Sequence, residues 1–204
     1  MKGDKMELPI VIDFVCPYCY YLVALLDTVR DTFPHTIRFL PNELTEEGRP
    51  PVDVCSDPER RARFGRALAP ACEKIGLDIK LPPNVCPRPY TQKAFEGFHF
   101  AAERGLGNEY CRRVMRAYFA EERDIGSEAV LAELAGEIGL DPALFLGALK
   151  DGTYRERQRQ AVRYAKETVK VEVVPTILLP GGRVQGFFPS GEELVRQIRE
   201  KSGA

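Results

Sequence analysis

Short apolar runs near both ends of the chain are typical of β-strands, and amphipathic segments lie between them. Residues 8–15 form an apolar run rich in β-branched side chains, which predicts a buried strand. Residues 17–31 carry apolar side chains at helical spacing, and residues 35–40 return to a strand pattern. Two strands joined by a helix form a right-handed parallel unit, so the chain is expected to open with β-α-β.

The central part of the chain, from about residue 56 to residue 168, has helical periodicity. Cap residues and glycines divide it into six predicted helices, which start near residues 56, 90, 108, 127, 141 and 153. The first helix is expected to begin with a capping box at Ser56–Glu59 and to end at Gly76. Asn108 is expected to cap the third helix.

The strand pattern returns near the C-terminus. Residues 171–179 predict a strand, Pro180–Gly182 a turn, and residues 183–188 the returning strand of a hairpin. Ser190 and Glu193 form another capping box, which predicts a last helix. The complete predicted order is β-α-β, six helices, and β-β-α.

This order predicts an α/β fold with an all-helical insertion. The predicted boundaries are residues 1–50 and 169–204 for the α/β domain and residues 51–168 for the inserted subdomain. The chain has 204 residues, of which 44% are hydrophobic and 29% charged, the balance of an ordinary globular protein. A chain of this length can bury one substantial core together with such an insertion.

The charge pattern argues against nucleic acid and membranes as partners. Lys and Arg number 29 and Asp and Glu 30, so no overall field attracts a polyanion or an anionic membrane. Basic stretches near residues 60–66 and 155–159 fall on helical patterns and are interpreted as solvated helix faces. No apolar segment precedes the first strand, so the sequence favours a cytoplasmic protein without a membrane span. A protein whose signal peptide had been removed would begin in the same way, and nothing in the sequence sets the number of subunits.

The clearest chemistry belongs to the Cys16-Pro17-Tyr18-Cys19 motif. Two thiols with this spacing form and reopen a disulfide with little movement of the backbone. The motif stands where the first strand passes into the first helix, and Pro17 suits the first helical position because it has no N–H to lose. Cys16 is therefore expected at a helix N-terminus, where free N–H groups and the helix dipole stabilise the thiolate that attacks a disulfide.

A zinc site is the other chemistry that a Cys-x-x-Cys motif suggests, because two such pairs hold one zinc ion. The other cysteines are 14 to 25 residues apart and the two histidines are isolated, so no metal site is predicted. Cys72 and Cys111 are interpreted as buried thiols. Cys55 and Cys86 both lie in Pro-rich loops and are candidates for a disulfide, although the sequence does not bring their Cα atoms together.

Asp13 interrupts the apolar run three residues before Cys16. A buried carboxylate at this position is a candidate proton acceptor during disulfide exchange. The alternation of side chains along a strand equally allows Asp13 to point to solvent. Both interpretations are open from the sequence.

The element order, the Cys16–Cys19 motif and the segment Val174-Pro175-Thr176 together resemble the thioredoxin superfamily. The inserted helices are similar to those of its DsbA-like branch, and within that branch the chain most resembles the FrnE and 2-hydroxychromene-2-carboxylate isomerase group. The stretches that carry the resemblance are residues 13–20, 117–125, 138–141 and 173–177. The resemblance covers nearly the whole chain and implies a thioredoxin-like fold.

The resemblance also implies a thiol–disulfide oxidoreductase that acts on protein or small-molecule disulfides. Cys16 would be the nucleophile and Cys19 the cysteine that resolves the mixed disulfide. A cis peptide bond after Val174 would hold Pro175 against the two sulfurs and leave the Val174 backbone free to pair with a substrate. An ordinary trans proline on an edge strand is the alternative.

Two positions depart from the proteins that the sequence resembles. The isomerases and the kappa-class glutathione transferases usually have serine in place of Cys16 and use glutathione, whereas oxidising DsbA-like proteins commonly have histidine in place of Tyr18. Pro17 and Tyr18 are instead the pair found in glutaredoxins, and both are expected to line the substrate site. No bound cofactor is expected, and glutathione is a candidate co-substrate. A glutathione-dependent isomerase or transferase and a redox-switched chaperone are the alternative functions.

Overall fold

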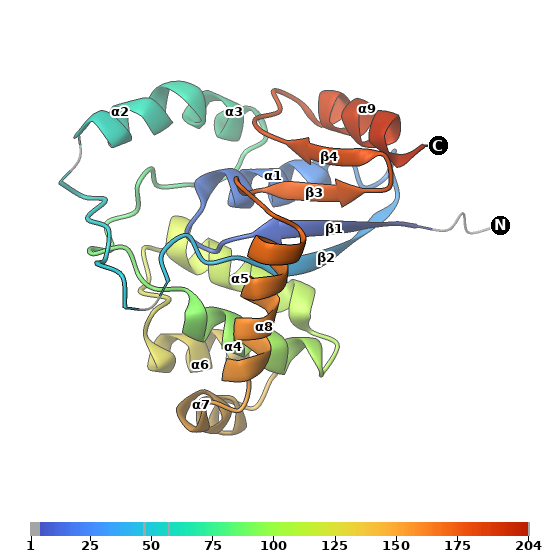
Figure 1. Ribbon diagram of the computed structural model, residues 1–204. Helices are drawn as coiled ribbons and strands as arrows, with labels where there is room; N and C mark the ends of the chain where they lie inside the picture. Colours follow the sequence, from blue (N-terminus) through green and yellow to red (C-terminus); the bar gives the residue numbers. More distant parts are fainter. Residues whose placement is uncertain (1–4, 47, 57, 204) are drawn as a thin grey trace.

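The computed structural model describes residues 5–46, 48–56 and 58–203. A four-stranded sheet with the order β2-β1-β3-β4 lies at its centre (Figure 1). The strands are β1 (Met6–Ile12), β2 (His35–Pro41), β3 (Thr176–Leu179) and β4 (Gly182–Gln185). β1 is parallel to β2 and antiparallel to β3, and β3 is antiparallel to β4. The two ends of the chain therefore meet in one sheet, as predicted for an α/β fold.

The burial of β1 and β2 follows from their places in the sheet. Leu8, Ile10, Val11 and Ile12 of the inner strand β1 have no exposed surface, so the strand is apolar on both faces. The edge strand β2 alternates between buried and exposed residues, because only one of its faces meets the core. The continuous apolar run before Cys16 therefore marks an inner strand that ends beside the dithiol.

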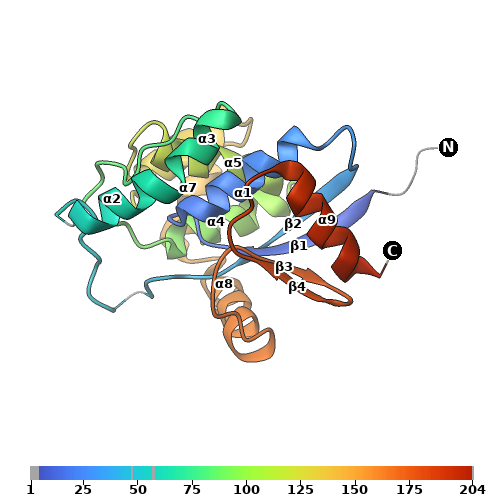
Figure 2. The same cartoon turned by 90° about the horizontal axis from the view of Figure 1, so that it is seen from above.

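Helices cover both faces of the sheet. Helices α1 (Pro17–Thr28) and α9 (Gly191–Ser202) lie on one face, and α8 (Arg155–Arg163) lies on the other (Figure 2). The Tyr21 hydroxyl of α1 donates a hydrogen bond to the Phe188 carbonyl at 2.8 Å, which ties α1 to the segment that leads into α9. The motif-bearing helix is thus fixed against elements from the opposite end of the chain.

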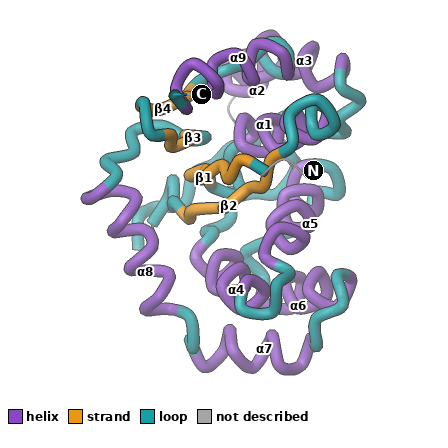
Figure 3. Tube along the Cα trace, turned by 90° about the vertical axis from the view of Figure 1, so that its right-hand side faces the viewer, coloured by secondary structure: helices purple, strands orange, loops and turns teal. Residues whose placement is uncertain are grey.

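The helical insertion predicted between the second and third strands is present. Its other helices are α2 (Pro58–Ala67), α3 (Ala69–Lys74), α4 (Gln92–Ala102), α5 (Gly107–Phe119), α6 (Glu128–Glu137) and α7 (Pro142–Asp151). A π-helical turn, Tyr164–Thr168, follows α8. Helices α2 and α3 lie at the same end of the molecule as α9, whereas α4, α6 and α7 gather at the opposite end (Figure 3). In the part of the chain that the structure describes, no helix is long and apolar enough to cross a bilayer.

One hydrophobic core joins the sheet and the insertion. The Phe14 ring, which follows β1, stacks on the Phe95 ring of α4 with 4.3 Å between centroids. Tyr110 of α5 approaches the same Phe14 ring edge-on at 6.4 Å. Aromatic pairs in these arrangements stabilise a fold beyond the burial of their area. The boundaries at residues 51 and 168 stay predictions, because the core continues across them.

Several predicted helix ends are confirmed by side-chain caps. The Ser127 hydroxyl accepts a hydrogen bond from the Val130 N–H, and the Asp141 carboxylate accepts from Ala143 N–H at 2.8 Å. At the start of α9 the Ser190 hydroxyl accepts from the Glu193 N–H at 3.2 Å. The first predicted capping box includes residue 57, which lies outside the described residues.

The single helix predicted between Ser56 and Gly76 is wrong, since α2 ends at Ala67 and α3 begins at Ala69. The reason is Pro70, which lies in the first turn of α3. Proline has no N–H to donate to the preceding turn, and its ring clashes with the carbonyl four residues earlier. The Pro70 ring therefore separates two helices whose apolar spacing alone is continuous.

The predicted cap at Asn108 is also wrong. Helix α5 begins at Gly107, and its N-cap residue is Leu106, two positions before Asn108. The Asn108 side chain instead donates a hydrogen bond to the Ile37 carbonyl of β2 at 3.0 Å. A tertiary contact to the sheet edge has replaced the local cap.

The strand predicted over residues 171–179 is shorter than expected, because β3 begins only at Thr176. The Val171 N–H bonds back to the Ala165 carbonyl at 3.0 Å, and Pro175 has no N–H to give to a ladder. The proline thus immediately precedes the strand instead of lying within it.

Candidate active site

Cys16 is the N-cap residue of α1 and has an extended backbone, with φ −91° and ψ 114°. Its N–H bonds to the Asp13 carbonyl at 3.1 Å, and its own carbonyl accepts from the Cys19 N–H at 3.0 Å. Pro17 occupies the first turn of the helix, as the sequence predicts. The motif therefore lies at a strand-to-helix junction with its first sulfur at the positive end of the helix dipole.

The two thiols of the motif have unequal surroundings. The relative exposure of Cys16 is 5% and that of Cys19 is 0%, and both are free thiols. Burial raises the pKa of the Cys19 thiol well above its usual value, and a hydrogen bond to Cys16 and the charge on Cys16 raise it further. Cys19 consequently keeps its proton at neutral pH, and its S–H is available as a hydrogen-bond donor to Cys16.

The segment before β3 reaches the dithiol. The Val174–Pro175 peptide bond is cis, which confirms that prediction. The Cys16 thiol donates to the Val174 carbonyl with 3.4 Å between Sγ and O, although 158 residues separate them. The Val174 carbonyl thus accepts a hydrogen bond from the reduced thiol. The resemblance implies instead that the Val174 backbone is free to pair with a substrate.

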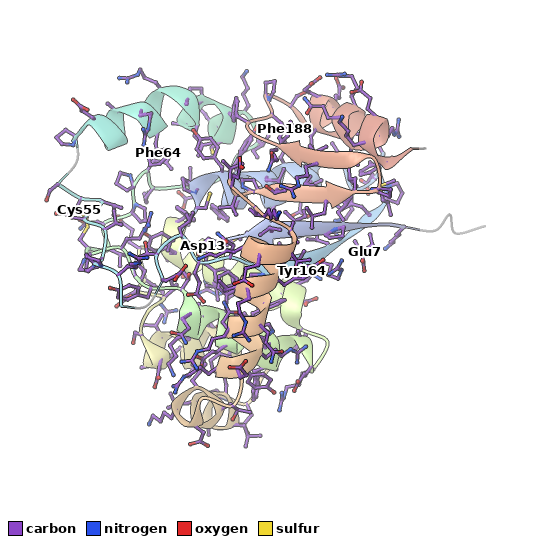
Figure 4. All side chains as sticks on the ribbon, in the orientation of Figure 1. Glu7, Asp13, Cys55, Phe64, Tyr164 and Phe188 are labelled. Atoms are coloured by element: carbon purple, nitrogen blue, oxygen red, sulfur yellow. A yellow bond between two sulfur atoms is a disulfide. The ribbon has the colours of Figure 1, made fainter. Side chains whose placement is uncertain are left out.

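Asp13 is buried, so the alternative in which it points to solvent is wrong. It lies just beyond the end of β1 (Figure 4). Its carboxylate accepts hydrogen bonds from the Leu44 N–H at 2.7 Å and the Val15 N–H at 3.4 Å. Burial raises the pKa of Asp13, and these hydrogen bonds and the Arg88 guanidinium oppose the shift. Its charge also raises the pKa of the Cys19 thiol; proton acceptance by Asp13 stays a prediction.

A mostly apolar cavity of ≈ 320 Å³ opens beside Cys16, and Pro17 and Tyr18 also line it. The Tyr18 ring packs edge-on against Phe64 of α2, with 6.2 Å between centroids, and against Phe187 at 6.4 Å. Figure 4 labels Phe64, whose side chain comes from α2. The helical insertion and the sheet domain therefore build this cavity together.

Sequence reasoning missed the two arginines of the cavity, Arg63 and Arg88. Arg63 belongs to a basic stretch that was interpreted as a solvated helix face, and its side chain is indeed exposed while also bordering the cavity. Arg88 lies in a loop with no periodicity to mark it. The missing signal is tertiary, because only the folded chain brings α2 and this loop to Cys16.

Cys55 and Cys86 form a disulfide, with 6.2 Å between their Cα atoms. The sequence leaves this pairing open, and the structure contains it, so Cys55 and Cys86 are oxidised. Asp53 lies beside the two sulfurs, but the sulfurs are bonded to each other and are not available to a metal ion. The bridge adjoins the cavity, because Val54, the neighbour of Cys55, lines the cavity wall. The Arg88 N–H also donates a hydrogen bond to the Val52 carbonyl at 2.9 Å, which joins the same two segments.

The other free thiols, Cys72 and Cys111, are buried as expected. Burial raises the pKa of Cys72 to about 11 and that of Cys111 well above its usual value. Neither thiol lines the cavity.

Residues 7–199 match the DSBA-like thioredoxin domain, almost the full length of the chain. The chain belongs to the DsbA-like thioredoxin family. A relative from Bacillus subtilis, described as the uncharacterized protein YwbO, is 38% identical over 174 residues, which cover 85% of this chain and 86% of the relative. Membership of the DsbA-like family supports an oxidoreductase with thiol–disulfide or glutathione-related chemistry.

Solved structures with the same fold include both kinds of protein that the sequence resembles. A probable DsbA oxidoreductase from Streptomyces coelicolor has a TM-score of 0.75 and 23% identity, covering 97% of this chain and 90% of its own. A 2-hydroxychromene-2-carboxylate isomerase has a TM-score of 0.70 and 19% identity, with 97% and 98% covered. The cytosolic disulfide reductase DsbM from Pseudomonas aeruginosa, solved with GSH, has a TM-score of 0.66 and 20% identity, with 97% and 95% covered. These likenesses confirm the thioredoxin-like fold.

Proposed function

We propose that this DsbA-like protein is a thiol–disulfide oxidoreductase in which Cys16 is the nucleophile and Cys19 the resolving cysteine. The observation that carries the proposal is the position of Cys16, at the N-cap of α1 and on the wall of a cavity, with Cys19 buried one helical turn further on. A substrate in the cavity reaches Cys16 first.

The exchange runs in two steps that conserve electrons. The Cys16 thiolate attacks one sulfur of the substrate disulfide, so that a mixed disulfide forms and the other substrate half leaves as a thiolate. Cys19 then loses its proton and attacks the Cys16 sulfur, which releases the second half and leaves the Cys16–Cys19 disulfide. The protein dithiol is oxidised by two electrons and the substrate is reduced to two thiols; the reverse sequence oxidises a dithiol.

We assign Asp13 as the group that accepts the proton of Cys19. Its carboxylate is buried, and its charge raises the pKa of the Cys19 thiol. The raised pKa of Asp13 brings its proton affinity closer to that of a thiol than an ordinary carboxylate would have. The assignment predicts that Asp13→Asn slows the second step and leaves the first step unchanged.

The surroundings of Cys16 support a disulfide-bearing peptide or small molecule as substrate. Exposed apolar side chains surround the site: Leu44 is 46% exposed, Val173 50% and Phe187 43%. Val174 and Pro175 follow Val173 directly, while Pro17 and Tyr18 line the cavity. We assign these four residues to substrate binding, with the Val174 carbonyl exchanging its Cys16 contact for a substrate N–H.

The proposal is tested by equilibrating the protein with glutathione redox buffers and counting free thiols in Cys16 and Cys19 by mass spectrometry. We expect the two residues to be oxidised together, as one two-electron couple. Cys19→Ser is expected to accumulate a mixed disulfide with glutathione at Cys16 that dithiothreitol removes. Cys72→Ser is the matched control, because it also removes a buried thiol. Independent titration of Cys16 and Cys19, or no adduct in Cys19→Ser, would contradict the proposal.

A glutathione-dependent reaction is the second candidate function. It is favoured by the family and by the structure of the cytosolic disulfide reductase DsbM with GSH, which has the same fold. In this case glutathione is a co-substrate that forms or reduces the mixed disulfide at Cys16, or is activated there for an isomerisation or transfer. Isomerase or transferase activity that needs glutathione and survives Cys19→Ser would favour this function. Client binding that survives Cys16→Ser would favour a chaperone instead.

A further inference from the structure

The cavity beside Cys16 has an unusual charge for an apolar pocket. Its walls are formed mainly by aliphatic, proline and aromatic side chains, including Leu44, Leu81 and Phe119. Among the described residues that line it, the charged side chains are Arg63 and Arg88, and no carboxylate is present. Two cations beside an apolar wall attract an anionic group more strongly than they would in open water.

Arg88 is the better placed of the two cations. Its Nη2 donates to the Thr45 hydroxyl at 2.6 Å, and its Nε is buried without a hydrogen-bond partner among the described residues. Its charge acts on the buried Asp13, whose pKa it lowers. An ionised Asp13 already accepts hydrogen bonds from the Leu44 and Val15 N–H groups. Even with Asp13 ionised, the two guanidinium groups and this one carboxylate together carry a net positive charge.

The guanidinium of Arg63 and the hydroxyl of Tyr118 are two further polar groups of the cavity. Arg63 comes from the exposed face of α2 and lies 5.6 Å from the centroid of the Phe64 ring. Tyr118 of α5 lines the cavity, and burial raises the pKa of its hydroxyl, so the group stays protonated. A protonated hydroxyl and two guanidinium groups are all hydrogen-bond donors. The polar side chains here therefore suit an acceptor-rich anion.

The size of the cavity limits what enters it. At ≈ 320 Å³ it lies at the lower end of the roughly 300–1,000 Å³ that ligand pockets span. One small molecule fills such a volume, and a folded protein surface does not enter it. An apolar body matches the walls and an anionic group matches the arginines.

We propose that this cavity selects a small disulfide whose apolar body carries a carboxylate, and that Arg88, with Arg63 at the exposed side, binds that carboxylate while Cys16 attacks the sulfur. The proposal rests on the thiol–disulfide function proposed above. The reaction is the same balanced exchange: the substrate accepts two electrons and leaves as two thiols, and the Cys16–Cys19 dithiol becomes a disulfide. Arg88 and Arg63 are specificity residues that exchange no electrons.

The test compares two aromatic disulfides that differ in charge, the disulfide of para-mercaptobenzoate and its dicarboxamide. The reduced protein is mixed with each probe, and the second-order rate constant of thiol release is measured for the wild type and for Arg88→Met. We expect Arg88→Met to slow the dicarboxylate about tenfold, because a charge-assisted hydrogen bond is lost, and to leave the dicarboxamide nearly unchanged. The intrinsic reactivity of each probe cancels, because each is compared with itself across variants.

Three further variants make the result decisive. Arg66→Met removes an exposed charge from the same helix as Arg63 without touching the cavity, and it is expected to behave as the wild type. Arg88→Lys is expected to keep part of the preference. Arg63→Met is expected to slow the dicarboxylate selectively but less than Arg88→Met, and it serves if Arg88→Met does not fold.

The carboxylate site and the proposed function are overturned by different results. Equal slowing of both probes by Arg88→Met, or slowing of neither, overturns the carboxylate site while Cys16 chemistry stands. If Arg88→Met does not fold, the same outcomes with Arg63→Met overturn it. Cys16→Ser is expected to release no thiol from either probe. Undiminished thiol release by Cys16→Ser overturns the proposed function itself.

Discussion

The two cysteine pairs of this protein are built by different parts of the chain. Cys16 and Cys19 are three positions apart within one turn, buried, and held by the junction of β1 and α1. Cys55 and Cys86 are 31 positions apart in loops, and they are joined in a disulfide. Local structure therefore positions the first pair, whereas only the tertiary fold positions the second.

Because the two pairs differ in position, we infer different roles for them. Cys16 lines a cavity at a helix N-terminus, where a thiolate and an incoming sulfur can meet. The Cys55–Cys86 bridge joins two segments that line that cavity, the one that contains Val54 and the loop that carries Arg88. We infer that the first pair performs the chemistry and the second fixes the wall against which the substrate binds.

The largest expected effect is that of Cys16→Ser on turnover. A serine hydroxyl does not form the mixed disulfide, so disulfide exchange should fall to the rate of a blank without protein. The Cys55→Ala/Cys86→Ala double variant should retain a Cys16-dependent rate, measured in the same assay with glutathione disulfide. Loss of exchange in the double variant alone, with Cys16→Ser active, would reverse the assignment of the two pairs.

The double variant Cys55→Ala/Cys86→Ala should instead lose stability. The bridge closes a loop of 31 positions, and the chain-entropy model gives such a cross-link about 3–4 kcal/mol of the free energy of unfolding. Urea unfolding followed by circular dichroism measures this loss, and dithiothreitol should produce the same loss in the wild type. Cys72→Ala is the control, since it removes a thiol but no bridge. A double variant as stable as this control would show that the bridge is no constraint on the fold.

The same contrast explains what the sequence could predict. The β-α-β start, the helix N-terminus at Cys16 and the cap at Asp141 depend on neighbours within a few residues, so their patterns are readable. The interruption of the helix at Pro70 is equally local, but continuous apolar spacing masked it.

Features that depend on distant parts of the chain were not readable. Asn108 bonds to the sheet edge instead of capping its helix, because the contact with Ile37 exists only after folding. Arg63 and Arg88 meet at one cavity through the packing of α2 and a loop, and no spacing in the sequence encodes this. Resemblance to a family, by contrast, led from Val174-Pro175 to the dithiol across 158 residues.

A smaller effect is expected from Asp13→Asn on the pH dependence of stability. Burial raises the pKa of Asp13 above its usual 3.8, so the folded protein holds this proton at pH values where the unfolded chain has lost it. The free energy of unfolding of the wild type should therefore fall as the pH rises from 3.8 through the raised pKa. Asp13→Asn should lack this fall, as measured by urea unfolding at a series of pH values.

Glu43 is a second buried carboxyl group that enters this comparison. Its pKa is also raised, mainly through burial, and the charge on Asp13 raises it further. The comparison is therefore made in a Glu43→Gln background, in which the difference between the curves reports Asp13. Parallel curves would mean that Asp13 ionises as readily in the folded protein as in the unfolded chain, and they would remove it as the proton acceptor for Cys19.

The smallest effect is expected at Cys72, a single buried cysteine that belongs to neither pair. Burial raises its pKa to about 11, so below neutral pH almost none of it is thiolate, and it does not line the cavity. Iodoacetamide should therefore modify Cys16 long before Cys72, as followed by mass spectrometry of the labelled peptides, and Cys72→Ser should leave disulfide exchange unchanged. Labelling of Cys72 at the rate of Cys16 would mean that a helix N-terminus beside a cavity is not what makes a thiol of this protein reactive.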